Sequence, residues 1–104
     1  MKVYLDDIRK TPEGWISARW PEDVIRHLQT GMVTHLDLDY YLSESGKESR
    51  TGYDVLIWIF RAVKNSDFKP PVMKAHTSSP DAMNLMNVAI VAIHWNYSLN
   101  HPEI

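Results

Sequence analysis

The stretch MVTHLDLD, from residue 32 to residue 39, predicts a β-strand that ends in acidic residues. Asp37 and Asp39 share one face of such a strand, because side chains two positions apart point to the same side. Leu36 and Leu38 alternate with them and share the other face. One face is therefore expected to be polar and the other to belong to the core.

Two other segments also predict strands that end in ionisable residues, and a third segment gives a weaker signal for a strand. Lys2–Asp6 and Val72–His76 are short runs rich in β-branched, aromatic or apolar residues that end in ionisable side chains. Trp15–Trp20 alternates apolar and polar residues and predicts another, short strand. We expect the three polar-ended strands to form the centre of the sheet.

Helices are expected between and after these strands. Pro21 opens a helix to about Thr30, since proline fits the first turn and Gly31 follows the last. Tyr53–Lys64 is apolar on nearly every side, which indicates a helix covered by more than one neighbour. Ser79 is a typical N-cap for a third helix, which we expect to run to roughly His94.

The alternation of strands and helices predicts one small α/β domain over residues 1–104. Parallel strands need crossover connections, which helices normally supply. We therefore expect a three-layer sandwich around a mostly parallel sheet. The polar stretch Tyr40–Gly52 is expected to be a long loop.

Composition excludes several classes of protein. The 104 residues contain 11 Lys and Arg against 13 Asp and Glu, and this balance disfavours broad binding to duplex nucleic acid. There is no cysteine, which removes disulfides and thiolate chemistry. The longest apolar runs have six residues, whereas a membrane span needs about 20. A cytoplasmic location without membrane contact is the expectation.

Chemistry in parallel sheets is found at the carboxyl ends of the strands. Asp6, Asp7 and Asp39 would meet at that edge, and like charges at short range need a cation or a proton. We expect them to bind magnesium, although neutralisation by the nearby Arg9 is an equally simple outcome. The carboxyl oxygens of Asp6 and Asp39 should then lie within roughly 4–6 Å of each other, close enough to share one ion.

Further residues at this edge complete the expected site. Asp37, Asp39 and His76 are the candidates for acid–base catalysis. Arg9 carries a planar fork of donors and is a candidate substrate contact. Thr77 and Ser78 precede a helix N-terminus, which favours bound anions, and are the other candidate substrate contacts.

Four segments together resemble one known family. They are VYLDDIRKTPEGW at 3–15, HLDLD at 35–39, TGYDVLIWI at 51–59 and HTSSP at 76–80. The pattern is similar to that of the cyclic-phosphate-processing receiver-like domains, which are related to two-component receivers. The similarity extends from residue 3 to about residue 93.

This resemblance implies a truncated receiver-like, or flavodoxin-like, fold. It also implies a domain that binds or processes a cyclic phosphate or phosphate ester of a nucleotide or RNA end, with magnesium at the acidic cluster. If the domain is an enzyme, the resemblance implies a metal-dependent cyclic phosphate phosphoesterase.

Two departures from the family pattern keep other functions open. Leu38 stands where the family has histidine, and Ser79 stands where it has asparagine. One alternative is therefore a non-catalytic interaction module or homodimer that uses the apolar helix at 53–64. The other is a phosphoacceptor receiver, with Asp39 or Asp37 as the residue that accepts the phosphoryl group. Ordinary receivers have a lysine after a fifth strand, and this sequence has no evident counterpart of that lysine.

Overall fold

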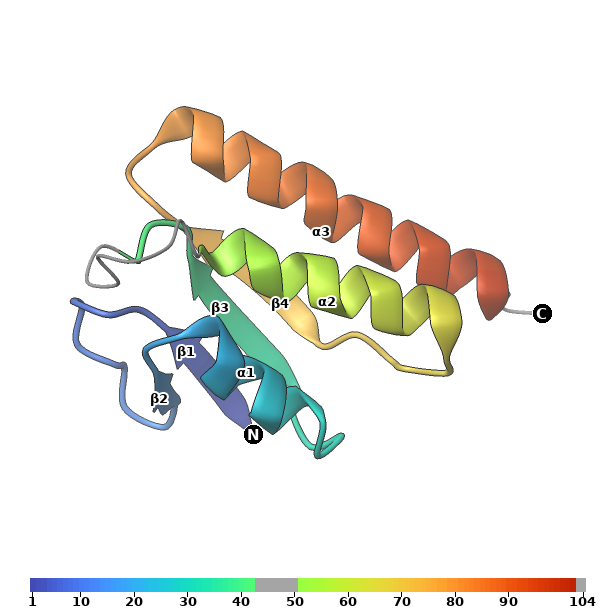
Figure 1. The fold of residues 1–104 in the computed structure, drawn as a ribbon, viewed down its shortest axis with the longest axis horizontal. Coiled ribbons are helices and arrows are strands. Elements are labelled where there is room, and N and C mark those ends of the chain that lie inside the picture. Colours follow the sequence, from blue (N-terminus) through green and yellow to red (C-terminus); the bar gives the residue numbers. More distant parts are fainter. Residues whose placement is uncertain (43–50, 103–104) are drawn as a thin grey trace.

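The computed structural model describes residues 1–42 and 51–102 of the chain (Figure 1). The loop expected at Tyr40–Gly52 lies largely outside these residues. The described part contains four strands and three helices in the order β1 (Lys2–Leu5), β2 (Ile16–Ala18), α1 (Pro21–Leu28), β3 (His35–Asp39), α2 (Gly52–Asn65), β4 (Val72–His76) and α3 (Pro80–Asn100).

The strands form one sheet in the order β2-β1-β3-β4, and every pair is parallel. The expected parallel pairing of the first strand with the strand that ends at Asp39 is confirmed. Leu5 lies opposite Leu38, and Asp39 lies opposite His76. The carboxyl ends of β1, β3 and β4 therefore meet at one edge of the sheet.

The core lies on one face of this sheet. Val3 is in register with Leu36, and Leu36 with Met73, and all three are buried. The same core contains the apolar side chains of α1, α2 and α3, among them Val24, Leu28, Val55, Leu56, Ile59, Val63, Met86 and Ile93. Figure 1 shows α1 and α2 crossing the same side of the strands, with α3 alongside α2.

The α/β class with a parallel, receiver-like sheet is confirmed, whereas the expected third layer is not found among the described residues. Lys2, His35, Val72 and Lys74 occupy the other face and remain at least partly exposed. The cause lies in the strand order. Both helical crossovers run in the same direction along the sheet, and right-handed crossovers in one direction place their helices on one face.

The helices α1 and α3 start where their sequence signals predict, whereas the strand expected at 32–39 begins only at His35. Pro21 opens α1, and the Ser79 side chain accepts a hydrogen bond from the backbone N–H of Ala82 at the start of α3. The helix α3 continues to Asn100, well past the expected end near His94. Tyr97 packs against the core in this extension, and tertiary contact of this kind extends helices beyond their local signals.

None of the helices described here is both long enough and apolar enough to cross a membrane.

Candidate functional site

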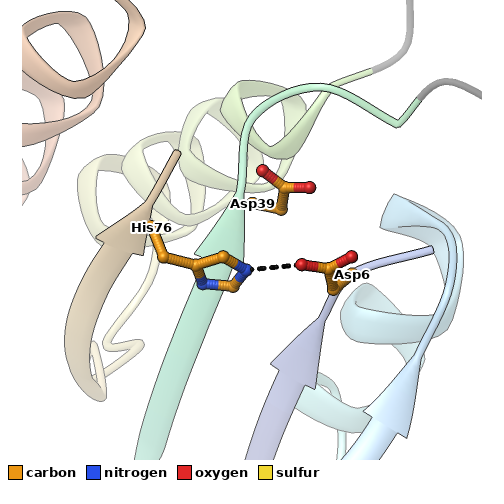
Figure 2. Close-up of side chains that lie close together, drawn as sticks. All are labelled: Asp6, Asp39 and His76. Carbon is orange, nitrogen blue, oxygen red and sulfur yellow. Dashed lines mark hydrogen bonds and ion pairs between the residues drawn. The ribbon is translucent and has the colours of Figure 1, made fainter. Parts of the chain in front are cut away.

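Three ionisable side chains converge at the carboxyl edge of the sheet. Asp6 follows β1, Asp39 ends β3 and His76 ends β4, and Figure 2 shows His76 and Asp6 pointing toward each other with Asp39 beside them. One ligand atom from each of the three lies within 4.8 Å of the others. The distance between the Asp6 and Asp39 oxygens therefore satisfies the geometric condition for sharing an ion.

The imidazole of His76 is held between two carboxylates. Its Nδ1 lies 2.6 Å from Oδ1 of Asp37, and its Nε2 lies 2.8 Å from Oδ2 of Asp6. Both ring nitrogens can donate only when the ring is an imidazolium. The arrangement therefore favours a positive charge on His76, flanked by two negative ones.

Asp6 is fixed from its other side by the backbone. Its Oδ1 accepts hydrogen bonds from the N–H groups of Ile8 and Arg9, each at 2.8 Å. This local turn orients the second oxygen, Oδ2, toward His76. Asp6 is only 5% exposed, and a buried carboxylate needs such partners to remain ionised.

The pKa shifts in the cluster have distinct causes. Burial raises the pKa of Asp6, but the N–H groups of Arg9 and Ile8, together with His76, outweigh it and hold the pKa below its ordinary value. Burial and the charge of Asp6 raise the pKa of Asp39. Two carboxylates at one edge thus have shifts of opposite sign, which is typical of functional sites.

The pKa of His76 is shifted in the direction that its two hydrogen bonds suggest. Burial lowers the pKa of His76, but hydrogen bonds to Asp37 and Asp6 outweigh it and raise the pKa above its ordinary value. In the metal-free cluster, His76 therefore binds its proton more tightly than a free histidine side chain in water does.

An aromatic pair supports the imidazole from the open face of the sheet. The ring of Tyr4 is stacked on His76, with centroids 4.8 Å apart and planes at 8°. Trp15 meets Tyr4 edge to face, with centroids 6.3 Å apart. Sequence reasoning did not identify Tyr4 as part of the site. The only signal was its position two residues before Asp6, on the same face of the strand.

The remaining predicted residues lie around this cluster at differing distances. A guanidinium nitrogen of Arg9 is 3.9 Å from Oδ2 of Asp6, and its side chain is half exposed. Thr77 and Ser78 directly follow His76, and the Thr77 hydroxyl accepts a hydrogen bond from the N–H of Ser79. Asp7 is half-buried next to Asp6 but does not belong to the group of atoms within 4.8 Å. The roles assigned to these residues stay predictions.

The start of α2 lies directly against the end of β3. The N–H of Gly52 donates to the carbonyl of Tyr40 at 3.0 Å. A Cβ atom on Gly52 would lie 1.9 Å from the carbonyl oxygen of Asp39, so no other residue fits without a shift of the backbone. This glycine therefore lets α2 approach the strand end that carries Asp39.

Leu38 points away from the cluster. It is fully buried and faces the core, whereas Asp37 and Asp39 point to the opposite face. A histidine at this position would enter the core rather than join His76. The leucine at position 38 therefore removes no side chain from the cluster. This weakens the argument that Leu38 indicates a non-catalytic module.

Comparison with known proteins agrees with this reading of the fold. The family model of the cyclic-phosphate processing receiver domain matches residues 1–92. The comparisons with curated proteins and with solved structures find no match. Since the family match covers most of the chain and includes all three cluster residues, the chain belongs to the cyclic-phosphate processing receiver domains.

Proposed function

We propose that this domain binds a phosphate ester, in the first place a cyclic phosphate of a nucleotide or RNA end, at the Asp6–Asp39–His76 cluster together with a divalent cation. The observation that carries the proposal is the convergence of one ligand atom from each of these residues within 4.8 Å. Family membership supports the phosphate chemistry.

The donor set fits a divalent cation. Carboxylate oxygens of Asp6 and Asp39 suit magnesium, which also keeps several waters. An imidazole nitrogen suits manganese or zinc better than magnesium. The contact of Nδ1 with Asp37 matches the carboxylate partner that metal-bound histidines usually have. A cation here would provide Lewis-acid stabilisation of phosphate oxygens.

Groups that suit a phosphate surround the cluster. The half-exposed guanidinium of Arg9 can offer two parallel N–H donors to phosphate oxygens. On the other side, Thr77 and Ser78 lead into the N-terminus of α3, where backbone N–H groups favour an anion. Arg9 and the two hydroxyls would therefore orient the ester above Asp39.

His76 and the two aspartates supply the proton chemistry. In the opening of a cyclic phosphate, a water oxygen forms a bond to phosphorus while a ring P–O bond breaks. The water gives up one proton, and the departing ring oxygen takes up another. Where the two aspartates hold the cation without the imidazole, His76 stays protonated between Asp37 and Asp6 and is placed to donate the second proton, and a carboxylate oxygen of Asp39 is placed to accept the first.

The first experiment measures cation binding by calorimetry and by tryptophan fluorescence. We expect magnesium and manganese to bind, and the contact of Trp15 with Tyr4 to carry the change to fluorescence. Asp39→Asn should weaken binding at least tenfold. Asp67→Asn is the matched control, because Asp67 is an exposed aspartate beyond the far end of α2. Equal affinity of both variants and the parent chain would contradict the proposed site.

The second experiment tests the ester. A 2′,3′-cyclic nucleotide is added in the presence of the cation and followed by ³¹P NMR, beside the 3′-monophosphate and the unphosphorylated nucleoside. We expect the cyclic phosphate to bind more tightly than the nucleoside, and conversion to a monoester would show catalysis. Binding of all three with one affinity would exclude phosphate recognition.

A further inference from the structure

An exposed apolar stripe runs along α3, away from the cluster. Its members recur at alternating spacings of three and four residues, which places them on one side of a helix. They are Leu85, Val88, Ala92, Trp95 and Leu99. Val88, Trp95 and Leu99 are 60%, 65% and 62% exposed, so the described chain leaves most of the stripe uncovered.

The stripe borders a groove between α3 and α2. This groove has a volume of about 260 Å³ and is lined mainly by apolar side chains. From α2 they include Tyr53, Leu56, Ile57 and Phe60, and from α3 Leu85, Val88, Ala92 and Ile93. Ala92 is the smallest side chain along the stripe, and it leaves room for a bulky side chain of another helix.

The surface carries almost no charge. Residues 82–102 contain no Asp, Glu, Lys or Arg, and the groove has one charged lining residue, Arg61. Two copies of this face can therefore meet without placing like charges along their helices. Interfaces between charged partners usually show a complementary excess of charge, which this surface lacks.

We propose that this surface, made of the α3 stripe and the α2–α3 groove, is the contact between two copies of this chain. A two-fold axis would place the same surface on both sides, so the protruding Trp95 of each copy enters the groove of the other. Alternation of apolar residues at three and four positions is the pattern by which paired helices interlock.

The dimensions agree with a stable dimer. The 21 residues of α3 span about 32 Å and the 14 residues of α2 about 21 Å, and each helix is about 10 Å wide, which gives a footprint of about 500 Å². Standard interfaces bury about 800 Å² of accessible surface on each partner, and accessible area exceeds the flat footprint. The face is therefore large enough to hold two copies together.

The test is the molar mass in solution, measured by light scattering and sedimentation from about 1 μM to about 1 mM, which spans Kd values of transient and stable dimers. The parent chain should be a dimer in this range. Trp95→Glu should raise the dimer Kd at least 30-fold or so, the effect of removing an interface hot spot. Met32→Glu is the control, because Met32 is equally exposed, at 63%, in the turn after α1.

Circular dichroism must show that Trp95→Glu remains folded, and Leu99→Lys replaces it if it does not. A parent chain that is monomeric up to the highest concentration overturns the proposal. A dimer that neither Trp95→Glu nor Leu99→Lys dissociates overturns it as well. Dissociation by Met32→Glu as well would show that the contact lies elsewhere. A monomeric parent chain that binds another protein through this groove would likewise overturn it.

Discussion

The Nδ1 atom of His76 lies 2.6 Å from Oδ1 of Asp37, although the two residues are 39 positions apart in the chain. The contact joins the neighbouring strands β3 and β4 on the open face of the sheet. It leaves Nε2 of the same ring directed at Asp6. Asp37 therefore determines which ring nitrogen His76 presents to the other two cluster residues.

Replacing Asp37 with asparagine should lower the pKa of His76. The loss of a neighbouring negative charge changes a pKa by about 1 unit or more. The ring resonances of His76, followed by NMR against pH without metal, measure the shift. His27 is an internal reference on α1, and an unchanged titration of His76 would contradict the assigned contact.

The metal-free protein should lose stability as the pH rises through the pKa of His76. The folded pKa is raised above the unfolded value of about 6.5, so the folded state binds the proton more tightly. This contribution is complete below about pH 6.5 and disappears as the pH passes the raised folded pKa. Urea unfolding in EDTA should show the decline, and His76→Gln should flatten it. Parallel profiles for both proteins would refute the prediction.

Asp39→Asn should stabilise the metal-free protein while it weakens cation binding. Burial, and after it the charge of Asp6, raises the pKa of Asp39, so the ionised form of Asp39 lowers the stability of the folded state. Removing the partly buried charge and its repulsion by Asp6 is worth a fraction of 1 kcal/mol at a partly exposed site, or about 1–4 °C in Tm. Thermal unfolding in EDTA and in magnesium separates the two effects. A lower Tm in EDTA would show that Asp39 stabilises the fold by itself.

Leu38→His should destabilise the fold without adding to the cluster. Leu38 is fully buried on the core face, and an imidazole without a partner there costs about 1–3 kcal/mol. Leu38→Met, which conserves volume and polarity, should cost less than about 1.5 kcal/mol. Urea unfolding measures both, and cation affinity should not increase in the histidine variant. A gain in affinity would show that residue 38 can reach the site.

Gly52→Ala should disturb both the fold and the cluster. The new Cβ would collide with the carbonyl of Asp39, and this backbone can move only by displacing the end of β3. We expect a loss of more than 2 kcal/mol or so, within the range of overpacking. Gly14→Ala is the control, since its positive φ of 87° adds strain in open space and costs about 1 kcal/mol. Equal losses in the two variants would contradict the close approach.

The sequence was most informative where a local rule governs the outcome. Alternation in HLDLD correctly separated Leu36 and Leu38 from the aspartates, because side chains alternate along any strand. Pro21 and Ser79 correctly predicted the starts of two helices, because caps act within one turn. Parallel pairing then brought the strand ends together.

The remaining features depend on contacts between distant residues. Nothing local distinguishes Asp6 from Asp7, yet the turn at Ile8 and Arg9 aims only Asp6 at His76. The stacking of Tyr4 on His76 needs β3 to lie between their strands. The one-sided cover of the sheet follows from strand order, which alternation of strands and helices does not specify.

The cluster also has a consequence for how the chain acquires its chemistry. Asp6 and His76 are 70 positions apart, and β3 must be in place between their strands before the two meet. Closing so long a segment of chain is slow compared with forming local helices. The N-terminal half of the molecule contains Asp6 and Asp39 but not His76, so neither half contains the complete cluster. In a nascent chain the cluster becomes complete only when β4, the last strand, has docked beside β3.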